Sequence, residues 1–151
     1  MSHAGTIAQR RPVESPPTRF RGALYSSVLA AAGLDTVLIV DDEPDLLEVT
    51  RFALESEGFG VETARNGEEA LALLLSGKRP GLVLLDLMMP VMNGWRFLDE
   101  IAKIPSLETI PIVILTAAGP SGVPGATEVL YKPVDLGRLL EVVERHARGA
   151  G

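Results

Sequence analysis

The spacing of apolar and polar positions changes along the chain at about Thr36. Residues 1–21 are polar, contain three prolines and have only scattered apolar positions. Such a segment buries too little apolar surface to offset the entropy lost on ordering. We therefore expect residues 1–35 to form a disordered or partly helical N-terminal extension, and residues 36–148 to form the folded domain.

After Thr36, short apolar runs alternate with longer helical periods, which is typical of βαβ units and a parallel sheet. The runs that predict strands are 36–40, 60–64, 82–86, 110–116 and 128–131. Three of these runs are almost continuously apolar, as strands covered on both faces usually are. The pattern therefore predicts a single five-stranded α/β domain.

Four segments carry the signals of helices, namely 43–58, 66–77, 93–103 and 135–148. The first places Pro44 in its first turn and keeps Leu46, Val49 and Ala53 at helical spacing. The last begins at Asp135, a good N-cap, and ends in basic residues that suit the negative end of the helix dipole.

The connection between the fourth and fifth predicted strands is too short for an ordinary helix. Residues 117–126 number only ten and include Pro120 and Pro124, whereas a parallel crossover usually takes about a dozen residues or more. We expect the fourth helix to be shortened or absent.

Two interpretations of this missing helix stay open. Neighbouring elements could close over the gap. Alternatively, apolar sheet surface near Val113, Leu115 and Val129 could be exposed and then covered by a partner, by a second copy or by the N-terminal segment 24–34.

Composition and charge narrow the class of protein. The chain has 151 residues, of which 46% are apolar, and no cysteine. One domain is therefore expected, and disulfides, thiolate metal sites and cysteine nucleophiles are excluded. Residues 37–151 carry ten Lys and Arg against eighteen Asp and Glu, a balance of −8. This acidity argues against direct nucleic-acid binding and favours metal ions or proteins as partners.

No apolar run reaches the roughly 18 residues that cross a bilayer. The nearest is 22–34, which follows Arg19 and Arg21 and keeps Leu24 and Val28 at helical spacing. We interpret it as a short amphipathic helix. A signal peptide is the alternative, but cleavage near its end would leave no spacer before the first strand. Cytoplasmic localisation is the expectation.

Reactive side chains gather at the carboxyl ends of the predicted strands, where open parallel sheets bind their ligands. They are Asp41, Asp42, Asp86, Thr116 and Lys132. Three carboxylates at one edge repel each other and require a cation, and a hard divalent ion such as Mg²⁺ suits them. Taken singly, each residue could be an ordinary cap, turn residue or solvated charge. Together they suit the formation of an acyl phosphate.

These residues lie in the motifs "VLIVDDEPDLL", "LVLLDLMMPVMNGWRFL", "IPIVILTA" and "GATEVLYKP". In this order and at these separations, the motifs resemble the receiver domain of two-component response regulators, over about residues 36–148. The resemblance implies a flavodoxin-like (βα)₅ fold, a doubly wound parallel sheet of strand order 2-1-3-4-5.

The resemblance also implies a role for each site residue. Asp86 would accept a phosphoryl group from a phosphohistidine. Mg²⁺ would be bound by Asp41, Asp42, Asp86 and the backbone carbonyl of Met88.

Further implied roles concern the switch. Thr116 and Lys132 would bind the phosphoryl oxygens, a cis peptide bond before Pro133 would direct the lysine inward, and Asn93 and Gly94 would form a turn beside the acceptor loop.

One position departs from the family pattern. The family usually places an aromatic residue three positions before the lysine, where this chain has Val129. Tyr131 lies next to the lysine instead, and strand alternation places these two neighbouring side chains on opposite faces of the strand. The usual aromatic readout of phosphorylation is therefore expected to be absent.

The resulting functional hypothesis is a stand-alone phosphoacceptor of a two-component phosphorelay, not an enzyme. Its donor would be a histidine kinase or phosphotransfer protein, and its output a contact with an unknown downstream protein or a homodimer. The alternative is a receiver-fold interaction module that signals without phosphorylation. A metal-dependent phosphatase is disfavoured because it would need a second aspartate two positions after Asp86, where this chain has Met88. A P-loop enzyme is disfavoured because "VDDEPD" replaces the glycine-rich turn that would admit a phosphate.

Overall fold

The computed structural model describes residues 36–117, 119 and 122–148. Its strands are β1 (Thr36–Val40), β2 (Gly60–Ala64), β3 (Leu82–Leu85), β4 (Ile112–Thr116) and β5 (Glu128–Tyr131). Its α-helices are α3 (Pro44–Ser56), α4 (Gly67–Leu75), α5 (Gly94–Ala102) and α6 (Leu136–Val143). A short 3₁₀ turn, η2 (Pro105–Leu107), follows α5, and a π-helical turn, η3 (Glu144–Arg148), continues α6. The N-terminal segment 1–35 lies outside the described residues.

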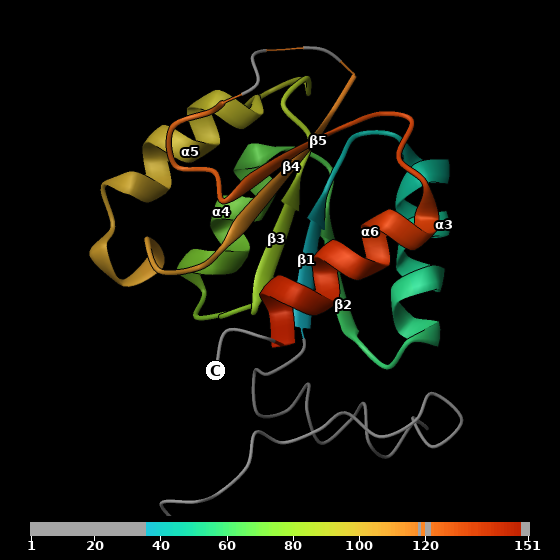
Figure 1. Ribbon diagram of the computed structural model, residues 1–151. Coiled ribbons are helices and arrows are strands. Elements are labelled where there is room, and N and C mark those ends of the chain that lie inside the picture. The colour runs from blue at the N-terminus through green and yellow to red at the C-terminus, as the bar shows by residue number, and fades with distance from the viewer. Residues whose placement is uncertain (1–35, 118, 120–121, 149–151) are drawn as a thin grey trace, which may run out of the picture.

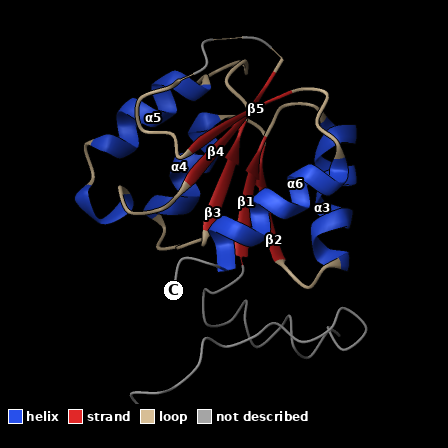
Figure 2. Ribbon diagram, viewed as in Figure 1, coloured by secondary structure: helices blue, strands red, loops and turns tan. Residues whose placement is uncertain are grey.

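The five strands form one parallel sheet in the order β2-β1-β3-β4-β5. The predicted flavodoxin-like topology is therefore confirmed. The central strands β1, β3 and β4 are buried almost throughout, because the sheet lies between two layers of helices (Figure 2). None of the helices in the described residues has the length and apolarity of a membrane span.

Helices α4 and α5 cover one face of the sheet, and α3 and α6 cover the other (Figure 1). Alternate residues of each strand point to these two layers. Leu38 and Val40 of β1 pack with Phe97 of α5, whereas Val37 and Ile39 belong to the cluster that holds α3 and α6. Two apolar cores result, one on each side of the sheet.

Helix α3 presents a different stripe to the sheet from the one its spacing suggested. Leu47, Thr50 and Leu54 are its buried residues, whereas Val49 is 59% exposed. Of the apolar positions predicted to face the sheet, Leu46 and Ala53 are only half-buried. Val49, Phe52 and Ala53 form a second apolar stripe beside the buried one, and its two large side chains are exposed.

None of the described residues between β4 and β5 is helical. Val123 from this connection is buried in the α4–α5 core, and Ala126 packs against the same core. Val113 and Leu115 are also buried, beneath the α3 and α6 side. The neighbouring residues therefore close over the gap left by the short crossover, and no large apolar sheet surface is exposed at Val113 or Leu115.

Strand β5 is tied to the C-terminal helix by Glu128. Its carboxylate lies 3.1 Å from Arg138, 3.0 Å from Arg145 and 2.9 Å from His146 Nε2. The hydrogen bond with His146 and the charges of the two arginines lower the pKa of Glu128. Because the π-helical turn carries Arg145 and His146, this cluster anchors that turn to the edge strand.

Replacing Glu128 by glutamine is expected to lower the free energy of unfolding by about 1 kcal/mol at neutral pH, since both arginines are half exposed and screened. A depressed carboxylate pKa contributes stability above the ordinary glutamate pKa of about 4.3, and that stability is lost as the pH falls through the folded pKa. The difference between the two proteins should therefore vanish on acidification. Urea unfolding across this pH range measures it, with Glu108→Gln at an exposed position remote from this cluster as a control. A difference that persists at acid pH contradicts the electrostatic origin.

Candidate functional site

Three carboxylates meet at the carboxyl edge of the sheet. Asp41 directly follows β1 and Asp86 directly follows β3, and these two strands are paired with Val40 opposite Leu85. The Asp86 amide donates to the Val40 carbonyl at 2.9 Å, which continues the pairing to the site itself. One carboxylate oxygen from each of Asp41, Asp42 and Asp86 lies within 4.8 Å of the others. Such a set of hard oxygen donors suits a divalent cation such as Mg²⁺.

Lys132 reaches this cluster from the end of β5. Its amide donates to the Thr116 carbonyl at 2.8 Å, and the peptide bond between Lys132 and Pro133 is cis. The Nζ atom donates to Asp41 Oδ2 at 2.9 Å and lies 3.6 Å from Asp86 Oδ2. The lysine therefore bridges the two buried carboxylates.

Burial and neighbouring charges act differently on the pKa values of Asp86 and Lys132. Burial raises the pKa of Asp86, and the Met88 amide and Lys132 only partly oppose this effect. Burial works to lower the pKa of Lys132, but the hydrogen bond to Asp41 and the charges of Asp41, Asp86 and Glu43 outweigh it, so that pKa lies above its ordinary value. The site thus holds a fixed ammonium charge beside a carboxylate whose charged form lacks full compensation. An added cation would supply that compensation.

The loop after Asp86 is held by backbone contacts. The Met88 amide donates to Asp86 Oδ1 at 3.1 Å, and the Gly94 amide donates to the Leu87 carbonyl at 3.0 Å. A Cβ at Gly94 would lie 2.7 Å from the Asp86 carbonyl oxygen, so only glycine allows α5 to begin this close to the loop. Asn93 caps α5 by accepting from the Arg96 amide. The Asn93-Gly94 pair thus fixes where the loop ends.

Val91, in the same loop, has a positive φ of 67°. A β-branched residue is strained in this region, and glycine is not. Because the Val91 side chain is 73% exposed, it provides little packing in return.

Replacing Val91 by glycine is expected to raise the free energy of unfolding by about 1 kcal/mol, because relief of the left-handed strain exceeds the added chain entropy. Urea denaturation measures the change. Ala72→Gly, at an exposed alanine of α4, should lose about 1 kcal/mol and serves as the control of opposite sign. Equal losses in both variants would contradict the strain at Val91.

The remaining predicted residues lie around the same edge. Thr116 is fully buried at the end of β4. Val129 is half-buried and packs against the α4–α5 core, whereas its neighbour Leu130 belongs to the opposite core. Tyr131 is exposed, and its hydroxyl donates to the Gly119 carbonyl at 3.4 Å. The aromatic ring therefore contacts the β4–β5 connection and lies two positions beyond Val129.

Glu43 is a site residue that sequence reasoning missed. Its amide donates to Asp41 Oδ1 at 3.0 Å, and its carboxylate lies 3.5 Å from Lys132 Nζ. Its position directly after the aspartate pair could have indicated a role in the site. The same position, directly before Pro44, is also typical of a residue that only precedes a helix. Its carboxylate adds to the negative charge around the lysine.

Comparison with known proteins agrees with this geometry. The response regulator receiver domain family matches residues 37–144. The chain is 40% identical over 124 residues to the transcriptional regulatory protein CpxR homolog of Haemophilus influenzae, covering 76% of this chain and 52% of that protein. It therefore spans about half the length of this curated relative.

Two solved structures share the fold. The receiver domain of a signal transduction histidine kinase from Syntrophus aciditrophicus is 33% identical with a TM-score of 0.69, over 77% of this chain and 92% of that one. The chemotaxis response regulator CheY4 of Vibrio cholerae is 31% identical with a TM-score of 0.67, over 74% and 98%. The fold, the family match and these relatives agree, and the chain belongs to the response regulator receiver domain family.

Proposed function

We propose that this protein is a phosphoacceptor of a two-component phosphorelay, phosphorylated on Asp86 in a Mg²⁺-dependent reaction. The donor would be the phosphohistidine of a histidine kinase or phosphotransfer protein, and the output a change in protein–protein contact. The observation that carries the proposal is the meeting of Asp41, Asp42, Asp86 and Lys132 at one edge of the sheet.

In this reaction an Asp86 oxygen attacks phosphorus, the bond from phosphorus to the histidine nitrogen breaks, and the imidazole leaves with the electron pair. Asp86 suits the acceptor role because the Met88 amide fixes one of its oxygens. The other carboxylate oxygen faces Lys132 at 3.6 Å. Lys132 would stabilise the charge that develops on the phosphoryl oxygens, since preorganised cations do so at little reorganisation cost.

Magnesium would be held by Asp41, Asp42 and Asp86 with the Met88 carbonyl, and would supply positive charge for the phosphoryl oxygens. The raised pKa of Asp86 supports this assignment, because a carboxylate whose charged form is penalised by burial and by two neighbouring carboxylates gains most from a cation. Trp95, the only tryptophan in the chain, is the second residue of α5 and directly follows Gly94. Its fluorescence should therefore change on titration with Mg²⁺, and the change should be lost in Asp86→Asn.

The switch would act through Thr116 and Lys132, whose backbones are joined by a hydrogen bond of 2.8 Å. A phosphoryl group adds about −1.5 to −2 charge and three acceptor oxygens beside them. New bonds to either residue would move the start of the β4–β5 connection. Tyr131 contacts that connection at Gly119, so it is the aromatic residue placed to respond.

The test is incubation of the full chain with Mg²⁺ and acetyl phosphate, followed by phosphate-affinity electrophoresis. A shifted band is expected for the wild type and for Asp99→Asn, a surface control on α5, but not for Asp86→Asn. The band should disappear when EDTA replaces Mg²⁺ and after treatment with hydroxylamine, which cleaves acyl phosphates. No shifted band in the wild type would favour a receiver fold that signals without phosphorylation.

A further inference from the structure

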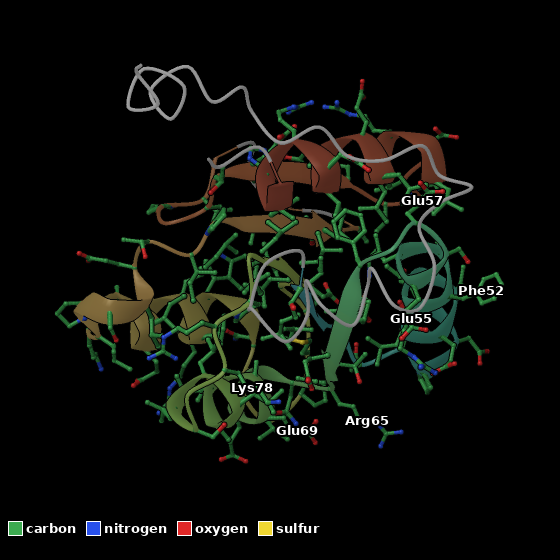
Figure 3. The ribbon with its side chains drawn as sticks, turned by 90° about the horizontal axis from the view of Figure 1, so that it is seen from below. Phe52, Glu55, Glu57, Arg65, Glu69 and Lys78 are labelled. Carbon is green, nitrogen blue, oxygen red and sulfur yellow. The ribbon has the colours of Figure 1, made fainter. Side chains whose placement is uncertain are left out.

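An apolar groove lies between α3 and α6, outside the phosphoacceptor site. Its volume is about 580 Å³, and its apolar lining comes from Val49, Phe52 and Ala53 of α3 with Leu136 and Leu140 of α6. Phe52 is 73% exposed and Val49 is 59% exposed. Figure 3 shows Phe52 pointing away from the sheet on the outer side of α3. Large apolar side chains exposed together in this way mark a surface that is covered by something else.

The two stripes of α3 strengthen this interpretation. Leu47 and Leu54 already bury one side of the helix in the core. A surface helix usually needs only that one apolar side, yet Val49, Phe52 and Ala53 add a second at spacings of three and four residues. The second stripe is therefore built for a partner that lies along the helix.

The charges of the groove limit what that partner can be. Its only charged lining residues are Glu48, which pairs with Arg51 at 2.6 Å, and Glu57, the C-cap of α3. They lie nine positions apart, which is about 13 Å along a helix. A segment that is apolar along one side and carries positive charge matches this groove.

The N-terminal part of the chain contains such a segment. Residues 19–34 read "RFRGALYSSVLAAAGL", with two arginines followed by an apolar run in which Leu24, Val28 and Ala31 keep helical spacing. As a helix, residues 22–34 would be about 20 Å long, the same length as α3.

The connection to the domain brings this segment to the groove. Thr36 begins β1 and is paired with Gly60 of β2, which lies three positions after Glu57 at one end of the groove. The N-terminal segment therefore joins the domain beside that end. If the segment followed the groove from there, Arg19 and Arg21 would lie near Glu48 at the other end.

We propose that residues 19–34 dock as an amphipathic helix in the groove between α3 and α6, with Arg19 and Arg21 directed toward its acidic rim. The N-terminal extension then covers the exposed side of α3 within the same molecule. A protein partner that uses this face must first displace it. The proposal does not depend on phosphorylation of Asp86.

Because the chain has no cysteine, paired thiols can report this contact in the full-length protein. One variant combines Val28→Cys with Ala53→Cys in the groove. The control combines Val28→Cys with Leu75→Cys, an exposed position at the end of α4 on the other side of the sheet. With a short bismaleimide at low protein concentration, the groove pair should form an intramolecular cross-link about tenfold faster than the control.

Charge reversal tests the second part of the proposal. Arg19→Glu with Arg21→Glu should slow the cross-link at low salt, whereas Arg10→Glu with Arg11→Glu should not. An unchanged rate overturns the role of the arginines. Equal rates for the groove and control pairs overturn the docking itself, and so do cross-links that form between two molecules, which would assign the groove to a second copy.

Discussion

Replacing Lys132 by methionine is expected to lower the free energy of unfolding by about 3 kcal/mol in the absence of divalent cations. The Nζ atom lies 2.9 Å from Asp41 and 3.6 Å from Asp86, whose side chains are only 5% and 7% exposed. In the part of the chain that the structure describes, no other cation pairs with either carboxylate. Methionine keeps the unbranched shape and most of the length of the side chain but removes the charge that compensates both carboxylates, so the loss is mainly electrostatic.

Urea unfolding with EDTA measures this loss, and Lys78→Met provides the control. Lys78 pairs with Glu62 at 3.3 Å, but both side chains are well exposed, so its removal should change stability by less than about 0.5 kcal/mol. Saturating Mg²⁺ should restore much of the stability of Lys132→Met, since a cation bound to the folded state stabilises it by mass action. Similar losses in the two variants would show that Lys132 does not offset the charge of the site.

Replacing Asp86 by asparagine is expected to remove phosphorylation entirely and also to raise the free energy of unfolding by about 1 kcal/mol at neutral pH without Mg²⁺. Burial raises the pKa of Asp86, and the charges of Asp41 and Asp42 add to this effect. With a raised pKa, the folded state holds the proton more tightly than the unfolded chain. The wild type therefore loses stability as the pH rises from the unfolded pKa of about 3.9 through the folded pKa.

Asparagine has no such penalty and can keep the hydrogen bond from the Met88 amide. The gain of Asp86→Asn over the wild type should therefore appear above the folded pKa, vanish below the unfolded pKa, and shrink when Mg²⁺ stabilises the wild type. Thermal unfolding over this pH range measures it, and Asp99→Asn is the matched surface control. A loss of stability in Asp86→Asn at neutral pH would contradict the conclusion that the buried, ionised Asp86 carboxylate destabilises the folded protein.

Much of the fold could be predicted because its signals are local. The continuously apolar runs of β1, β3 and β4 reflect burial on both faces, and the glycine, proline and asparagine positions mark the helix ends. Parallel topology then brings the strand ends together, so Asp41, Asp86 and Lys132 could be placed at one edge before their distances were known. That the described residues between β4 and β5 form no helix was equally predictable from the ten residues 117–126 and their two prolines.

Other features depend on tertiary packing and were not visible in the spacing. Helix α3 has two apolar stripes, and only the sheet decides that Leu47 and Leu54 are buried while Val49 and Phe52 are not. The covering of Val113 and Leu115 depends on how α6 packs on one face of the sheet, and the filling of the crossover gap depends on how Val123 packs on the other. Glu43 joins the site because the turn after β1 directs its amide toward Asp41, whereas its place before Pro44 in the sequence indicates a helix start equally well.

Peptide mapping of the phosphorylated protein tests the proposed function most directly. The full chain is incubated with acetyl phosphate and Mg²⁺, the acyl phosphate is reduced with borohydride to fix its position, and the digest is analysed by mass spectrometry. We predict a single modified residue, Asp86, in the presence of Mg²⁺, and none when EDTA replaces it. Modification of a different residue, or the absence of any modification in a protein that binds Mg²⁺, would contradict the assignment of Asp86 as the phosphoacceptor.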